Sequence, residues 1–152
     1  MACAGHIARA ERDWVVFLSF ELTRRDTDRL SGLHTDLIRV VRGAALHYRP
    51  SGKFIVVEGM RTLARQKELF AAGKSKTMKS RHLTGHAVDL APLVDLDGDG
   101  VAELTWVRES FLPIVDAMRA SAAAAGVLIE WGGDWTSFFD APHWQLSWSR
   151  YP

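Results

Sequence analysis

Two short polar segments, far apart in the chain, contain the residues whose types and spacing could do chemistry. The first, residues 80–89, holds two histidines, His82 and His86, and a carboxylate, Asp89. The second, residues 134–145, holds a further histidine and two aspartates. Together they can supply three nitrogen or oxygen ligands and a spare carboxylate. A catalytic zinc site uses such a set, because three protein groups hold the metal and water occupies the fourth position.

The two histidines of the first segment do not form a helical zinc motif. Such a motif has a glutamate between histidines four residues apart, but here Gly85 stands between them and no glutamate does. Alternation that begins near His86 instead predicts a strand from which Asp89 projects, with His82 in the preceding loop. We therefore expect His82 and Asp89 to converge on one metal, and His86 to have a structural or supporting role.

His143 and Asp140 complete the predicted site. His143 follows Pro142 at the start of a predicted strand, so a stiff backbone fixes its direction. Asp140 could face the same metal without binding it and act as the general base that takes a proton from the bound water. In the alternative interpretation, Asp140 and Asp134 are turn and capping residues and His143 is a histidine of the core.

Composition indicates one ordinary globular domain. The chain has 152 residues, of which 47% are hydrophobic and 24% charged, so it can bury a core. The formal net charge of +1 does not indicate a nucleic-acid partner. Cys3 is the only cysteine, which excludes a disulfide framework and a thiolate metal cluster. The apolar run 14–20 is too short to span a bilayer, and residues 1–13 lack the features of a secretory signal.

Periodicity and capping residues predict the elements that must position the site. Thr23 and Asp26 are N-cap candidates for a short helix, and His34 or Thr35 for a second helix that ends before Pro50. Two further helices are predicted over residues 62–72 and 111–125. The second is expected to bury Phe111, Leu112, Val115, Met118 and Ala122. Short strands are predicted over residues 54–57, 87–92, 103–106, 128–131 and 143–148.

This order of elements predicts the fold class. Helices come first, followed by strands with one long crossover helix, which is typical of an α+β domain with a small, mostly antiparallel sheet and flanking helices. Alternation in residues 87–92 gives that strand one solvated face, and Pro92 puts its end near a sheet edge. Residues 143–148 alternate as well.

Several motifs are similar to those of a known enzyme family. The motifs are residues 80–89, 131–135 and 140–145. They resemble the zinc peptidases grouped with D-Ala-D-Ala carboxypeptidases and dipeptidases, which implies a Hedgehog/DD-peptidase-like fold. Residues 58–66 and 22–40 resemble one branch of that group, the L-alanyl-D-glutamate endopeptidases found as phage endolysins and bacterial wall hydrolases. The resemblance covers about residues 20–149.

The resemblance assigns a role to each residue of the site. It implies that zinc is held by His82, Asp89 and His143. It implies Asp140 as the catalytic base, and Arg61 and Ser80 as groups that bind the substrate carbonyl or the oxyanion. A guanidinium beside a zinc-bound carbonyl would stabilise the charge that develops during attack.

Residues near these positions have their own expected roles. The alternative for Arg61 is a surface salt bridge with Glu58 or Glu68. Gln66 is expected to pack or to lie on a helix surface, outside the site. The Asp134-Trp135 pair is expected to orient a ligand histidine.

An acidic segment at residues 95–100 matches the opening of a calcium loop. Asp95, Asp97 and Asp99 stand at positions 1, 3 and 5, with a glycine at position 6. Position 12, where a bidentate glutamate belongs, is Trp106, although position 9 is a glutamate. An acidic hairpin tip is slightly favoured over a calcium site.

These observations predict a zinc-dependent peptidoglycan endopeptidase that hydrolyses the L-Ala–D-Glu bond of the stem peptide. Two alternatives stay open: a D-Ala-D-Ala carboxypeptidase or dipeptidase, and a non-catalytic zinc-containing module that binds the wall. We expect residues 21–152 to form the catalytic domain and residues 1–20 to be an extension without an assigned role.

The expected partner is the peptidoglycan stem peptide, with no nucleic acid and no stable membrane insertion, and we expect a monomer. Because no secretory signal is recognised, we expect the chain to stay in the cytoplasm until a membrane lesion made by another protein releases it to the wall.

Overall fold

The computed structural model of the protein describes residues 20–49 and 52–152. Cys3, almost all of the predicted extension 1–20, and the turn residues Pro50 and Ser51 lie outside the described residues.

One antiparallel sheet forms the centre of the molecule, with strands in the order β1, β2, β5 and β4, and β3 also paired with β2. The strands are β1 (Lys53–Glu58), β2 (Ala87–Val94), β3 (Glu103–Leu104), β4 (Ile129–Trp131) and β5 (His143–Leu146). The helices are α1 (Arg24–Arg29), α2 (Thr35–His47), α3 (Leu63–Ala71) and α4 (Leu112–Ala125). Short 3-10 helices are η1 (Arg81–Thr84), η2 (Arg108–Phe111) and η3 (Gly132–Asp134). The predicted α+β domain with a small antiparallel sheet is confirmed.

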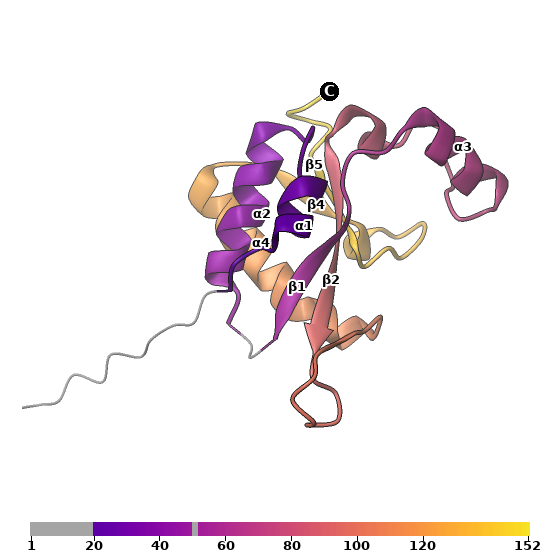
Figure 1. Ribbon diagram of the computed structural model, residues 1–152. Coiled ribbons are helices and arrows are strands. Elements are labelled where there is room, and N and C mark those ends of the chain that lie inside the picture. The colour runs from indigo at the N-terminus through magenta and orange to yellow at the C-terminus, as the bar shows by residue number, and fades with distance from the viewer. Residues whose placement is uncertain (1–19, 50–51) are drawn as a thin grey trace, which may run out of the picture.

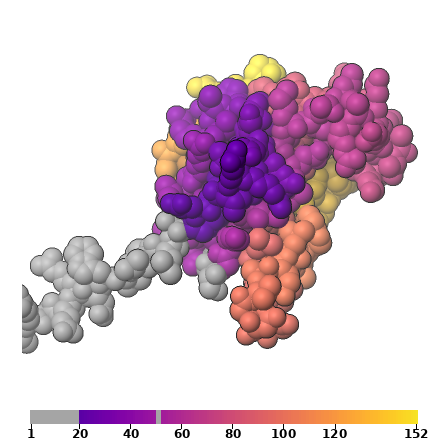
Figure 2. Space-filling view, viewed as in Figure 1, coloured from indigo at the N-terminus to yellow at the C-terminus, as the bar shows by residue number. Residues whose placement is uncertain are grey.

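The helices divide into two groups. Helices α2 and α4 pack against each other beside the sheet, whereas α3 projects from the opposite end of the molecule (Figure 1). Figure 2 shows α3 and the hairpin after β2 as two projections from the body. Within the described residues, no helix combines the length and the apolar character needed to cross a bilayer.

The core lies between α2, α4 and the sheet. From α2 it contains Leu37, Val40, Val41, Ala44 and Ala45, which lie on one face of the helix. From the strands it contains Phe54, Val56, Val88, Leu90, Trp144 and Leu146. Burying each large apolar side chain contributes roughly 1.5–3 kcal/mol. This packing makes the sheet a rigid platform for the side chains that project from its other face.

Capping side chains define the start of the first two helices. Thr23 and Asp26 form a capping box at α1, with Asp26 N–H donating to Thr23 Oγ1 at 3.2 Å and Thr23 N–H donating to the Asp26 carboxylate at 3.0 Å. His34 Nδ1 caps α2 by accepting the N–H of Asp36 at 3.1 Å. The second oxygen of Asp26 accepts the N–H of Val56 in β1 at 2.9 Å. One buried carboxylate therefore joins α1 to the sheet.

Two strands are more buried than alternation predicts. The expectation of one solvated face and an edge position for residues 87–92 is wrong, because β2 is central, with β1 on one side and β5 and β3 on the other. Pro92 falls between the residues that pair with β5 and those that pair with β3, so its missing N–H interrupts neither ladder. Strand β5 lies between β2 and β4, and all four of its residues are buried.

The buried face of α4 also differs from the expected one. Leu112, predicted to face the core, is 49% exposed, and Ile114 is buried in its place. At 3.6 residues per turn, Leu112 lies about 120° around the helix from the buried Met118, whereas Ile114 lies only about 40° from it, so Ile114 and not Leu112 belongs to the buried face. Phe111, Val115, Met118 and Ala122 are buried as predicted.

Replacing Asp26 with alanine is expected to destabilise the fold by about 2–4 kcal/mol, because it removes the capping box and leaves the Val56 N–H buried without an acceptor. Urea denaturation followed by circular dichroism measures the change. The control is Asp28→Ala on the exposed side of the same helix, where only a surface ion pair with Arg24 is lost and the change should stay below about 1 kcal/mol. Equal stability of the two variants would contradict this account of the α1–β1 link.

Candidate metal centre

Asp89 and His143 meet because their strands pair at that position. Strands β2 and β5 are antiparallel, and Asp89 is the register partner of His143. Directly paired residues project to the same face of a sheet with Cβ atoms about 4.5–5.5 Å apart. In the structure, His143 Nδ1 lies 3.2 Å from Asp89 Oδ1. Strand pairing therefore brings the two polar segments of the sequence together.

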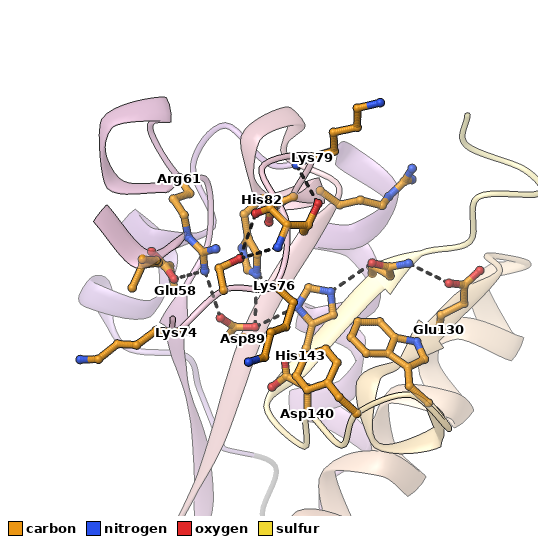
Figure 3. A pocket seen from close by; sticks show the side chains of 18 of the residues that line it. Glu58, Arg61, Lys74, Lys76, Lys79, His82, Asp89, Glu130, Asp140 and His143 are labelled. Atoms are coloured by element: carbon orange, nitrogen blue, oxygen red, sulfur yellow. Dashed lines mark hydrogen bonds and ion pairs between the residues drawn. The ribbon is translucent and has the colours of Figure 1, made fainter. Parts of the chain in front are cut away.

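His82 reaches the same point from the 3-10 helix η1. Its Nε2 lies 3.2 Å from Asp89 Oδ1 and 3.3 Å from His143 Nδ1, and the three side chains converge in Figure 3. Residues 81–84 were expected to be a loop, but they form one helical turn in which His82 is buried. Gly85 ends that turn with φ +71°, and a side chain there would meet the Gly32 carbonyl at 2.5 Å. This close contact explains the glycine.

Hydrogen bonds on the far side of each ring fix which nitrogen of each histidine carries a proton. His82 Nδ1 lies 2.7 Å from the carbonyl oxygen of Gly59, which can only accept, so Nδ1 is the protonated nitrogen. His143 Nε2 lies 3.1 Å from Gln145 Oε1, and Gln145 Nε2 donates to the Glu130 carboxylate at 2.7 Å. Glu130 thereby turns the amide oxygen of Gln145 toward the histidine. The lone pairs of His82 Nε2 and His143 Nδ1 both point into the site.

Three atoms that carry lone pairs thus face one point. Without a positive charge between them this buried arrangement would be unfavourable. Burial raises the pKa of Asp89, but where the facing histidine nitrogens carry protons in place of a metal, their hydrogen bonds outweigh burial and hold that pKa well below its ordinary value. Burial lowers the pKa of His143, but hydrogen bonding and attraction to Asp89 outweigh it and raise the pKa. The carboxylate therefore attracts a positive charge, and these three residues fit a divalent metal ion.

Arg61 lies against this centre, with only 8% of its side chain exposed. It forms ion pairs with Glu58 and, at 3.7 Å, with Asp89. Its NH1 donates to Gln66 Oε1 at 2.8 Å, and its backbone N–H donates to the His82 carbonyl at 3.0 Å. The salt bridge with Glu58 that was the alternative interpretation is present, but it is part of the wall of the site and does not lie on the open surface.

Ser80 and Asp140 line the same cleft as the three candidate ligands. Ser80 caps η1, where its Oγ accepts the N–H of His82 at 3.4 Å. Burial raises the pKa of Asp140, and the negative charge of Asp89 raises it further. A carboxyl group with a raised pKa in this cleft suits proton transfer at neutral pH.

Gly132 sets the position of the segment that carries Asp140. The Asp140 N–H donates to the Gly132 carbonyl at 3.1 Å. A Cβ at Gly132 would meet Asp140 Cβ at 3.0 Å and His143 Cβ at 3.1 Å. The Trp131-Gly-Gly motif therefore leaves space for Asp140 and His143 to lie side by side.

Two residues of the polar segments lie outside the centre. His86, expected to have a structural or supporting role, hydrogen-bonds Thr84 Oγ1 at 2.9 Å and packs against the His34 ring. Asp134 was expected to orient a ligand histidine, but it forms an exposed salt bridge with Arg119 at 2.8 Å. Its neighbour Trp135 does contact the His143 ring, with centroids 5.0 Å apart.

Sequence analysis did not place Gln66, Gln145 or Glu130 at the site. Gln145 follows His143 by two residues on one strand, and that period of two could have indicated a shared face. Glu130 is the register partner of Gln145 across β4 and β5. No local signal distinguishes Gln66, which is the one buried residue of α3.

The predicted calcium ligands Asp95, Asp97 and Asp99 lie on an exposed hairpin tip, with carboxylate oxygens within 4.8 Å of one another. The Asp95 carboxylate accepts the N–H groups of Gly98 at 2.7 Å and Gly100 at 2.9 Å. These hydrogen bonds are those of an acidic turn, the interpretation that the sequence slightly favours. Calcium binding stays a prediction.

Comparisons with known proteins agree on one class, the L-alanyl-D-glutamate peptidases. The chain belongs to the phage L-alanyl-D-glutamate peptidase family, whose model matches residues 18–146. It is 28% identical over 127 residues to the L-alanyl-D-glutamate peptidase of Escherichia phage T5, covering 81% of this chain and 87% of the phage protein. It is 27% identical over 106 residues to the peptidoglycan L-alanyl-D-glutamate endopeptidase CwlK of Bacillus subtilis (strain 168), covering 60% and 59% of the two chains.

A solved structure supports the same assignment. The crystal structure of the Serratia marcescens L-Ala D-Glu endopeptidase ChiX matches with a TM-score of 0.77 and 40% sequence identity, over 88% of this chain and 95% of that one. The predicted family and fold are confirmed.

The purified protein is expected to bind about one divalent metal per chain at this centre, as measured by elemental analysis after dialysis. His82→Ala and His143→Ala should each lose the metal, because two donors cannot hold it tightly. His86→Ala is the matched control and should keep the metal, since His86 lies outside the cleft. Loss of metal in His86→Ala with retention in His82→Ala would contradict the assignment.

Gln145→Leu is expected to weaken metal binding by roughly 10- to 100-fold, because the Nε2–H of His143 loses the acceptor that fixes its ring. Competition with a chromophoric chelator measures the affinity, and circular dichroism checks that the fold is kept. An unchanged affinity would show that the Glu130–Gln145 pair does not support the ligand.

Proposed function

We propose that the protein is a zinc-dependent peptidoglycan endopeptidase that hydrolyses the L-Ala–D-Glu bond of the stem peptide. The observation that carries the proposal is the triangle of donor atoms, with sides of 3.2, 3.2 and 3.3 Å. Ligand atoms at the corners of a tetrahedron with bonds of about 2.0–2.1 Å are about 3.3 Å apart, so the donors already have the spacing that zinc requires. The names of the relatives support the choice of bond.

The residues of the cleft divide the chemistry among them. Zinc, when bound, would polarise the scissile carbonyl and activate a water molecule. Asp140 would take the proton of that water and return it to the leaving amine, for which its raised pKa is suited. Arg61, held by Glu58 and Gln66, would stabilise the negative charge that develops on the carbonyl oxygen. Ser80, at the N-cap of η1, would position the substrate beside it.

Asp140 also weighs against the non-catalytic alternative. A module that only binds the wall has no need of a free carboxylate with a raised pKa in the cleft of the three donors. The D-Ala-D-Ala alternative requires the same chemistry on a different bond, so only the products distinguish it.

Digestion of purified cell wall is expected to expose a new amino-terminal D-Glu, detected by mass spectrometry. Asp140→Asn should keep the metal and lose about 10²- to 10⁴-fold in kcat, because proton transfer is removed while the three donors stay in place. Asp134→Asn is the control and should keep full activity, since Asp134 pairs with Arg119 at the surface. Release of terminal D-Ala would support the carboxypeptidase alternative, and full activity of Asp140→Asn would exclude Asp140 as the base.

A further inference from the structure

The lining of the cleft carries unpaired positive charge that the proposed chemistry does not use. Lys74, Lys76 and Lys79 all line the cleft, and the run 74–81 contains no acidic residue. We name residues 74–79 the lysine segment. In the part of the chain that the structure describes, none of its three ammonium groups pairs with a carboxylate, whereas Arg65 pairs with Glu68.

Gln66 holds the lysine segment in place. Its side chain is fully buried, although α3 is otherwise exposed. Gln66 Nε2 donates to Ser75 Oγ at 2.8 Å and to the Thr77 carbonyl at 2.6 Å, while its Oε1 accepts from Arg61 at 2.8 Å. One amide therefore ties the backbone that carries the lysines to the arginine beside the metal centre. The position of the lysine segment is therefore coupled to that of Arg61.

The rest of the cleft lining has a different character. It includes aromatic side chains from three separate parts of the chain, namely Trp106, Trp135, Phe138 and Trp148. In Figure 3 Glu130 lies beyond His143, on the far side from Arg61 and Lys74, whereas Lys76 lies in front of Asp89 and His143. An anionic group of the substrate would be repelled by the carboxylates of Glu130 and Asp140 and attracted to the lysine segment.

The bond that is cut determines where such an anion lies. Cleavage leaves D-glutamate as the amino-terminal residue of one product. This residue has two carboxyl groups. One of them continues the peptide, and the other is free. That free carboxylate lies within a few bonds of the scissile nitrogen. We propose that the lysine segment, positioned by Gln66, binds the free carboxylate of the D-glutamate and makes the enzyme prefer acidic over amidated stem peptides. This inference rests on the proposed function.

The test compares two synthetic muropeptides that differ only at this group, one with the free acid and one with the carboxamide. The wild-type protein is expected to have a higher kcat/KM on the acid, mainly through a lower KM, and the preference should shrink as salt is added. In Lys74→Ala/Lys76→Ala/Lys79→Ala, the ratio of acid to amide kcat/KM is expected to fall about tenfold, as for two or three partly exposed ion pairs. Lys67→Ala is the control on α3, because Lys67 does not line the cleft, and its ratio should equal that of the wild type.

The outcomes separate this inference from the function on which it rests. If the wild type cuts neither muropeptide, the proposed function fails, and the inference fails with it. If both muropeptides are cut and the triple variant keeps the wild-type ratio of kcat/KM values, the lysines do not recognise the free carboxylate. An equal loss of kcat/KM on both muropeptides has the same meaning. If the variant is weakened only on intact walls, the segment attracts an anionic wall polymer, which also overturns the inference.

Discussion

The convergence of three lone pairs on one point is the constraint on which the rest of the structure depends. Asp89 Oδ1, His82 Nε2 and His143 Nδ1 lie within 3.3 Å of one another, and buried acceptors at this spacing need a shared proton or cation between them. The register of β2 and β5 brings the aspartate opposite one histidine, and η1 brings the other. A shift of one residue in that register would turn His143 to the opposite face and remove the site.

Hydrogen bonds on the side away from the centre orient both histidines. His82 is oriented through the Gly59 carbonyl, and the neighbouring Val56 of β1 is tied to α1 by the buried carboxylate of Asp26. His143 is oriented through Gln145 and then Glu130, which also accepts the N–H of Trp148 at 3.3 Å. Metal centres commonly rely on such outer hydrogen bonds to fix ligand tautomers. Contacts that stabilise the sheet therefore also help to fix the geometry of the centre.

The sequence correctly predicted the features that depend on residues close together in the chain. Thr23 and His34 start their helices because capping is decided within a turn, and the types of His82, Asp89 and His143 indicated a metal site. Features that depend on contacts between distant parts of the chain were not predicted. The central position of β2 needs β5, which lies some fifty residues later in the chain, so alternation alone made it an edge strand. Asp134 was misplaced because its partner Arg119 is on another helix, and the buried role of Gln66 exists only once the segment after α3 folds back on it.

X-ray absorption spectroscopy of the protein loaded with one equivalent of zinc tests the central claim most directly. The account predicts a first shell of nitrogen and oxygen atoms at about 2.0–2.1 Å that includes the scattering pattern of two imidazole rings. A shell of oxygen atoms alone, without imidazole scattering, would place the metal in the acidic hairpin or elsewhere and would contradict the assignment of His82, Asp89 and His143.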